Sequence, residues 1–361
     1  MLDTTKKVLY RFVFGANVAT ILLLWLCASS VYINPSISAI VGVMGLAFPA
    51  FFFANVCFLF LWLLFHWRTA WLPVVGFLCC IGSIRTYLPL NLPSPHPKRC
   101  IKVLSYNVMA FGAHPSEKPI YSYAARYIKE SDADIVCLQE GAAISDEMRL
   151  NTLEELACYR HQDTVNHSSN RLVLLSRYPI LKTEHIHYES EENVSAAFWL
   201  KIENDTVIVI NNHLESNRLT MSDREMYKNL VKDPESMSIK QSSRFLASKI
   251  GQASKKRAYQ ADSVAAYIQR HKGYSMIVCG DFNDSPISYA RYTICQGLTD
   301  TFLATGNGIG HSFNRDGIYV RIDHLFCTDD WEPYGAMVDT ETDASDHYPI
   351  SCYLQKKRTR K

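Results

Sequence analysis

Val278-Cys279-Gly280-Asp281-Phe282-Asn283-Asp284 is the stretch around which this 361-residue chain is organised. It completes an apolar run that begins at Met276 and predicts a short buried strand. Gly280 permits a tight exit, and Asp281 and Asn283 point to one side of an extended segment. A carboxylate beside a neutral amide suits the handling of a phosphate, because one group takes a proton or metal while the other donates a hydrogen bond. Aspartate and asparagine after a strand are also frequent turn formers, so the stretch alone leaves a structural role open.

Two other strand-like runs end in polar side chains. Ile101–Val108 alternates apolar and polar residues and carries Asn107 near its end, and Asp134–Glu140 is an apolar run closed by an acid. Glu140 at the rim of a buried strand offers a hard oxygen ligand to a divalent cation. Taken singly, Asn107 is equally explained as a turn residue and Glu140 as a solvated strand end.

Histidines and acids continue this pattern toward the carboxyl terminus. His213 follows the strand-like run Thr206–Asn211 and could donate a hydrogen bond to a phosphoryl oxygen, or be a structural residue. Further on, Asp323 lies in the strand-like run Tyr319–Phe326, and an Asp346–His347 pair precedes the last predicted strand.

The first ninety residues have a different character. Three apolar stretches, Val8–Ile33, Ile37–Phe65 and Ala70–Leu90, are each about twenty residues or longer, which predicts three transmembrane helices. The predicted organisation is an anchor at 1–90, a proline-rich linker at 91–99 that holds the next domain off the membrane, a catalytic domain at 100–355 and a basic tail at 356–361. We therefore expect an integral multi-pass membrane protein.

Charge restricts both the partner and the orientation. Residues 1–99 contain seven basic side chains and one acid, which leaves 30 basic and 34 acidic residues for the remainder. Such a mildly acidic domain is a poor match for non-specific nucleic acid binding. Lys6, Lys7, Arg11 and Arg68 favour a cytoplasmic amino terminus and an extracytoplasmic catalytic domain, whereas unpaired cysteines in that domain favour a reducing compartment.

A polar, helix-favouring stretch at 217–256 precedes a predicted helix at Arg257–His271. From Arg218 to Arg257 it carries ten basic residues against four acids. The stretch is either a solvated helical face or a basic lid that attracts anionic substrates or a lipid surface. The eleven cysteines show neither a CxxC pair nor zinc-ligand spacing, so we expect buried thiols rather than a disulfide framework.

In chain order, the motifs resemble the endonuclease/exonuclease/phosphatase superfamily, which includes deoxyribonuclease I-like nucleases, neutral sphingomyelinases, inositol-polyphosphate phosphatases and deadenylases. The resemblance covers about residues 100–354 and implies an α/β fold. This fold is a four-layer α/β/β/α sandwich of two mixed sheets, here preceded by three transmembrane helices. The motifs are SYNV at 105–108, QE at 139–140, HL at 213–214, GDFN at 280–283, RID at 321–323 and SDH at 345–347.

The resemblance also implies a metal cofactor, Mg²⁺ with Mn²⁺ as a substitute. Glu140 and Asn107 would hold the metal, with Asp346 as a further contributor. Oxygen ligands of this kind suit Mg²⁺ or Mn²⁺ better than zinc, and no cluster of cysteine and histidine competes.

The remaining motif residues receive catalytic roles by the same resemblance. Asp281 would orient or deprotonate the attacking water, and Asn283 and His213 would bind the scissile phosphate. His347 would bind the phosphate or assist proton transfer, with Asp323 supporting its charge and orientation.

These observations lead to three hypotheses. The first is a membrane-anchored, Mg²⁺-dependent phosphoesterase acting on a phosphodiester or phosphomonoester, with a lipid or small phosphoester ranked ahead of nucleic acid. The second is a deoxyribonuclease I-like nuclease, and the third a non-catalytic membrane scaffold on the same fold. The bilayer and a phosphoester (phospholipid, small phosphoester or nucleic acid) are the expected partners, with no obligate protein partner. The insertion at 217–256 and Asn170-Arg171 depart from the family pattern near the substrate side.

Overall fold

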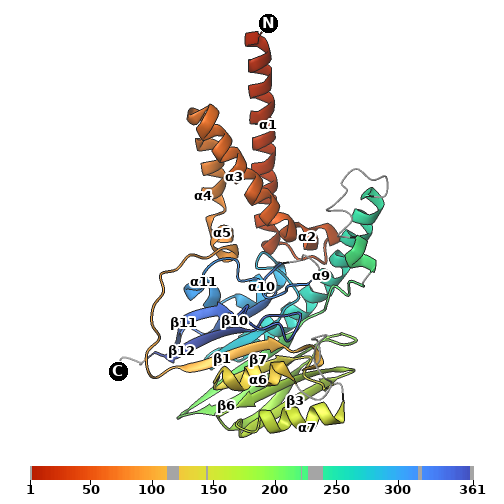
Figure 1. Ribbon diagram of the computed structural model, residues 1–361, viewed down its shortest axis with the longest axis vertical. Helices are drawn as coiled ribbons and strands as arrows, with labels where there is room; N and C mark the ends of the chain where they lie inside the picture. Colours follow the sequence, from red (N-terminus) through yellow and green to blue (C-terminus); the bar gives the residue numbers. More distant parts are fainter. Residues whose placement is uncertain are drawn as a thin grey trace.

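The computed structural model describes residues 2–111, 122–143, 145–220, 222–226, 239–315 and 319–357. Two six-stranded sheets form the body of the molecule, and a group of helices projects from one end of it with the amino terminus at the far tip (Figure 1). The sheets are mixed, because each contains one parallel pair among antiparallel neighbours.

The first sheet has the strand order β11-β12-β1-β2-β4-β3. Its parallel pair, β1 with β2, brings Asn107 opposite Gln139, the residue before Glu140. The polar strand β3 was not predicted, because it has few apolar residues and is defined by its pairing along β4. The strands are β1 (Ile101–Asn107), β2 (Ile135–Gln139), β3 (His161–His167), β4 (Asn170–Ser176), β11 (Trp331–Val338) and β12 (Ile350–Lys356).

The second sheet has the order β5-β6-β7-β8-β10-β9. Its parallel pair, β7 with β8, places His213 opposite Asp281, and the antiparallel strand β10 places Asp323 opposite Asp281 on the other side. The predicted buried strand at Met276–Cys279 is thus confirmed within β8. The strands are β5 (Ile180–Ile186), β6 (Val194–Ile202), β7 (Asp205–His213), β8 (Ser275–Asp281), β9 (Thr299–Asp300) and β10 (Asp323–Cys327).

Three apolar clusters hold the sandwich together. The central one lies between the sheets and joins side chains such as Val103 and Cys137 to Phe198, Val209 and Leu325. On the outer faces, α6 and α7 cover the first sheet and α9 covers the second. Each fully buried apolar side chain of this size contributes about 1.5–3 kcal/mol. The four-layer α/β/β/α arrangement is therefore as predicted. The helices are α6 (Tyr123–Glu130), α7 (Asp146–Glu155), α9 (Ile239–Arg270), α10 (Tyr289–Cys295) and α11 (Thr301–Thr305).

Helix α9 differs from the prediction in its length. Its 32 residues join the second half of the polar stretch to the helix predicted at Arg257–His271. No proline interrupts it, so the backbone hydrogen bonds continue through the boundary that the composition suggested. Its amino-terminal half extends past the sheet and packs on α2.

The apolar amino-terminal segment contains α1 (Leu2–Ser29), α2 (Ala39–Met44), α3 (Phe48–Phe65), α4 (Trp71–Cys79) and α5 (Ile81–Tyr87). Two helical stretches, Thr4–Tyr32 and Ile40–Phe65, are long and apolar enough to cross a membrane. The third predicted span is broken, because Cys80 has non-helical backbone angles and α4 and α5 meet at a 70° bend. The prediction of three spans thus becomes two clear candidates and a bent pair.

The linker lies against the sandwich. Asn91 donates hydrogen bonds to the carbonyls of Leu303 and Gly306, and His96 stacks on Tyr353 with ring centroids 3.9 Å apart. The helices also contact the sandwich directly, through Ile287. The composition could not reveal these packing contacts, and the prediction that the linker holds the domain off the membrane stays a prediction. Of the predicted basic tail, residues 358–361 lie outside the described residues.

A buried polar cluster joins α1 to α3. Asn17 donates a hydrogen bond to Asn55 Oδ1 (3.0 Å) and accepts one from Trp62 Nε1 (2.8 Å). Both asparagines are fully buried. Hydrogen bonds between apolar helices fix their rotation relative to each other, since few other polar partners exist there.

We predict that Asn17→Val destabilises the helical segment by about 1 kcal/mol, because Asn55 and Trp62 lose their partner. The check is thermal unfolding of the detergent-purified protein. Leu22→Ala, at an exposed position of the same helix, is the control. An equal melting temperature for Asn17→Val and wild type would contradict the role given to this cluster.

Candidate active site

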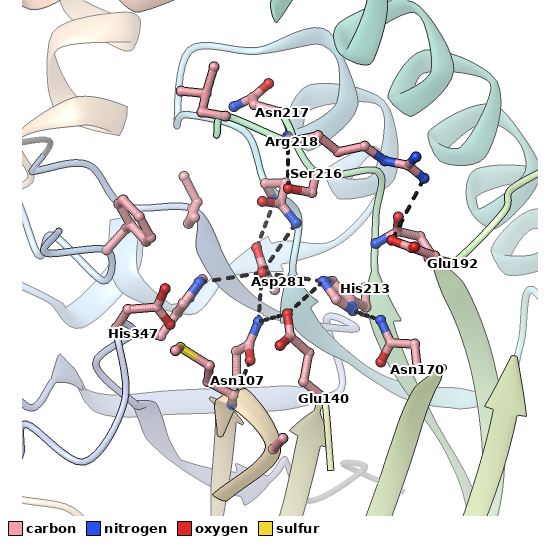
Figure 2. Close-up of a pocket in the computed structure, with 18 of the residues that line it drawn as sticks. Asn107, Glu140, Asn170, Glu192, His213, Ser216, Asn217, Arg218, Asp281 and His347 are labelled. Carbon is pink, nitrogen blue, oxygen red and sulfur yellow. Dashed lines mark hydrogen bonds and ion pairs between the residues drawn. The ribbon is translucent and has the colours of Figure 1, made fainter. Parts of the chain in front are cut away.

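The carboxyl ends of β1, β2, β7 and β8 meet at one edge of the sandwich, around a cavity of about 420 Å³ (Figure 2). Residues far apart in the chain gather here because the strands of both parallel pairs end at this edge. The eighth predicted site residue, Asp323, lies behind His347 and is bonded to it. The other seven line the cavity: Asn107, Glu140, His213, Asp281, Asn283, Asp346 and His347.

The first sheet contributes an oxygen-rich group. Asn107 Nδ2 lies 3.2 Å from Glu140 Oε1 and 3.1 Å from Asp281 Oδ2, so one amide orients both carboxylates. Ser345 donates a hydrogen bond to the Asn107 carbonyl (2.8 Å), which fixes the loop that carries Asp346. Burial raises the pKa of the Glu140 carboxyl, and the negative charge of Asp346 adds to this rise.

The second sheet contributes Asp281, which is 1% exposed. Gly280 precedes it with φ of 133°, and a Cβ there would lie 2.0 Å from the Asn212 carbonyl oxygen, so only glycine fits between these strands. The backbone N–H of Asn283 donates to Asp281 Oδ1 (2.8 Å), and its side-chain amide donates to Oδ2 (3.2 Å). Burial raises the pKa of Asp281 to about 6.

His347 lies between two aspartates. Its Nδ1 is 2.8 Å from Asp323 Oδ2, and its Nε2 is 3.6 Å from Asp281 Oδ2. Burial alone would lower the pKa of His347, but the charges of Asp323 and Asp281 outweigh it and raise that pKa to about 10. Ser312 accepts hydrogen bonds from the backbone N–H groups of Ile322 and Asp323 and so holds the start of β10 in place.

His213 faces the same centre from β7. Its Nε2 is 3.7 Å from both Glu140 Oε1 and Asp281 Oδ2, and its Nδ1 is 2.6 Å from the side-chain nitrogen of Asn170. Burial lowers the pKa of His213, which favours the neutral ring. A neutral imidazole with one nitrogen engaged by Asn170 can offer the other as a single hydrogen-bond donor.

The family of this protein follows from its similarity to known proteins. The sequence profile of the endonuclease/exonuclease/phosphatase family matches residues 104–347. The chain belongs to this family. Its members are typically metal-dependent hydrolases of phosphoester bonds. The profile of a domain of unknown function matches residues 10–87, and no curated protein matches the chain.

Several solved structures are similar to this family member. TDP2 from Caenorhabditis elegans is 17% identical with a TM-score of 0.50, over 79% of this chain and 84% of that one. A family protein from Bacteroides thetaiotaomicron is 15% identical with a TM-score of 0.49, over 72% and 98% of the two chains. Beta toxin from Staphylococcus aureus is 14% identical with a TM-score of 0.47, over 70% and 99%. At such identities the likeness concerns the fold alone.

The residues of this family member fit a divalent cation. Ligand atoms of Asp281, Asp323 and His347 lie within 4.8 Å of one another. In this group, however, the imidazole of His347 lies between the two carboxylates and interacts with both of them. Glu140 and Asp346 instead offer carboxylate oxygens, the donor type that Mg²⁺ prefers. Asn107 lies beside them, with its Nδ2 toward Glu140 and its Oδ1 accepting from the Met109 backbone N–H. Glu140 and Asp346 would hold such a cation, and its charge would offset their mutual repulsion.

Several cavity residues were not predicted as site residues. Asn170 was noted only as a departure from the family pattern, and its contact with His213 could not be read from its place at the start of β4. Arg218, Leu219 and Arg224 come from the predicted basic lid and line the cavity. Arg218 forms ion pairs with acidic neighbours, so part of the predicted positive charge is neutralised. Its partners are Glu191, Glu192 and Glu215. Residues 221 and 227–238 of the lid lie outside the described residues.

Hydrogen bonds beneath the cavity connect the two sheets. The buried Gln139 side chain of β2 donates to Asn211 Oδ1 of β7 (2.7 Å) and to Ser105 Oγ of β1 (3.2 Å). Asn211 in turn donates to the Leu138 carbonyl (3.0 Å). The strand ends that carry Glu140 and His213 are thus held in register across the interface between the sheets.

We predict that Asn211→Leu lowers the free energy of unfolding by about 1–3 kcal/mol, because the buried Gln139 amide loses its shortest hydrogen bond and the Leu138 carbonyl loses a donor. Hydrolytic activity should fall as well, since the two halves of the site lose their mutual register. Denaturant unfolding and steady-state kinetics on the same preparation check both effects. A variant as stable and active as wild type would show that these bonds are dispensable.

Proposed function

We propose that this protein is a membrane-anchored, Mg²⁺-dependent phosphoesterase that hydrolyses a phosphodiester or phosphomonoester, with a lipid or small phosphoester as the favoured substrate. The observation that carries the proposal is the convergence of the predicted site residues on one cavity, seven on its wall and Asp323 behind His347. They come from four strands and three loops that chance would not bring to one edge.

In this proposal the first sheet holds the metal. Glu140, Asp346 and Asn107 provide its ligands, and Mn²⁺ can replace Mg²⁺ because both prefer oxygen donors. When bound, the metal neutralises charge on the phosphoryl oxygens and so lowers the barrier to attack by water.

The second sheet handles the water and the phosphate. Asp281 accepts the proton of the attacking water, and the amides of Asn107 and Asn283 fix the direction of its Oδ2 atom. Asn283 and neutral His213 donate hydrogen bonds to the phosphate. Protonated His347, held by Asp323, binds a phosphoryl oxygen or gives a proton to the leaving oxygen.

The location of the cavity supports a substrate at the membrane. Ile287, four residues after Asn283, is buried in a cluster with Leu24, Phe48 and Cys80 of the apolar helices. Four extended residues span at most about 14 Å, so Asn283 lies within that distance of this cluster. The headgroup layer outside the hydrocarbon core is itself about 5–7 Å thick on each side. If the apolar cluster lies at the edge of the hydrocarbon core, the phosphate of a membrane lipid and the site therefore lie at similar distances from that core.

We further propose that the catalytic domain is extracytoplasmic. Lys6, Lys7, Arg11 and Arg68 line one hollow. The amino-terminal end of α1 lies at the tip away from the sheets (Figure 1). Basic residues near span ends remain preferentially on the cytoplasmic side. A crossing through α1 then places the sandwich on the opposite side of the membrane.

We predict Mg²⁺-dependent hydrolysis of phospholipids in vesicles, loss of activity with EDTA, and recovery with Mg²⁺ or Mn²⁺, because the oxygen ligands bind hard cations. The measurement is product release from a panel of phospholipid vesicles, inositol phosphates, RNA and plasmid DNA. Rapid DNA cleavage without turnover of any other substrate would identify a nuclease. Absence of hydrolysis across the whole panel would favour a non-catalytic scaffold.

We predict that Asp281→Ala, Glu140→Ala and His347→Ala each lower kcat by about 100-fold or more, as expected for single catalytic groups. Kinetics on the best substrate of the panel measure this, with the exposed Glu130→Ala as the matched control. Wild-type turnover by Asp281→Ala would contradict its role as the base.

A further inference from the structure

The apolar helices contact the sandwich beside the catalytic residues of the second sheet. We propose that the helical segment, residues 2–87, positions the half of the active site that handles water and phosphate, with Gly45, Ile287 and Arg321 as positioning residues. This inference rests on the proposed phosphoesterase function and adds that the segment is a working part of the enzyme rather than only a tether.

The first contact is a close approach of two backbones. A Cβ at Gly45 would lie 1.9 Å from the Ile287 carbonyl oxygen, so only glycine permits this approach. The Ile287 side chain, 2% exposed, packs among the helices with Leu24 and Phe48. Because Ile287 follows Asn283 by four residues, the helices hold the loop that leaves the catalytic strand β8.

The second contact runs through α9. A Cβ at Gly42 of α2 would lie 2.5 Å from Ser254 Cβ, so α2 lies directly on α9 at this point. One turn further on the same face of α9 is Arg257, which is 1% exposed. Its guanidinium donates to Asp284 Oδ2 (3.0 Å) and to the Glu215 carbonyl (2.9 Å). These two acceptors follow Asn283 and His213 closely in the chain.

The third contact is made by Arg321, two residues before Asp323. Arg321 is 1% exposed and lies over the Phe302 ring, 4.2 Å from its centroid. It donates hydrogen bonds to the carbonyls of Thr86, near the end of α5, and of Ile309. A buried guanidinium is costly unless its N–H groups are bonded. The apolar segment thus supplies an acceptor that Arg321 needs, two residues before the aspartate that holds His347.

All three contacts lead to residues of the second sheet. Asn283, His213 and Asp323, to which they lead, all belong to the second sheet or the loops that leave it. Glu140 and Asn107, which would hold the metal, lie at the ends of β1 and β2 in the other sheet. A disturbance at the helix contacts should therefore impair turnover while leaving metal binding intact. General destabilisation of the domain would impair both.

The test uses the full-length protein in lipid nanodiscs and the variant Gly45→Val. We expect kcat to fall about 10-fold to 100-fold, as for small displacements of catalytic groups, with an unchanged Kd for Mn²⁺ measured by titration calorimetry. The matched control is Gly15→Val in α1, where an added Cβ meets no atom within 4 Å. It should retain both the turnover and the Mn²⁺ affinity of wild type.

Ile287→Ala keeps the inference testable if Gly45→Val fails to assemble, since it removes only the side chain held by the helices. It should show the same loss of kcat with unchanged Mn²⁺ affinity. Wild-type kcat in the assembled variants, or an equal loss of turnover and of Mn²⁺ affinity, would overturn the positioning role. A wild-type protein without metal-dependent hydrolysis would overturn the proposed function and this inference with it.

Discussion

The structure depends on hydrogen bonds that cross from one sheet to the other beneath the cavity. Gln139 at the end of β2 and Asn211 near the end of β7 are both fully buried and bonded to each other. The apolar packing between the sheets is strong but not directional, and alone it would allow them to slide. The bonds from Gln139 to Asn211 and from Asn211 to the Leu138 carbonyl favour this register, because sliding the sheets would break both of them. This register places Glu140 beside His213.

The same interface explains how so many ionisable groups are kept close together. Three carboxylates of the site each have a neighbour that stabilises them: Asn107 for Glu140, Asn283 for Asp281, and His347 for Asp323. The carboxylates of Glu140 and Asp346 thus lie on the side of the first sheet. The groups that donate or exchange protons lie on the side of the second sheet. In the proposed enzyme, metal and water meet where these two sets face each other.

The helical segment and the sandwich form one packed unit rather than two domains joined only by a linker. Ile287 extends the apolar cluster of the helices into the sandwich, and Arg321 takes an acceptor from α5. Such contacts restrict the distance and tilt of the site relative to the helices. If the segment crosses a bilayer as we propose, the cavity stays close to the surface, where a lipid phosphate lies.

The sequence by itself determined the strands with strong apolar patterns and the long apolar helices, and its motifs predicted the residues that gather at the cavity, because strand periodicity and short motifs are local properties. It did not determine the polar edge strand β3 or the bend at Cys80. Nor did it determine the pairing of Asn170 with His213, since these residues are distant in the chain. The linker shows the same limit: its prolines predicted a spacer, while packing through Ile287 decided that the helices and sheets touch. The local sequence determines which secondary structure a segment can form. Only tertiary packing decides which groups become neighbours, because burial and hydrogen bonding stabilise contacts between segments that are distant in the chain.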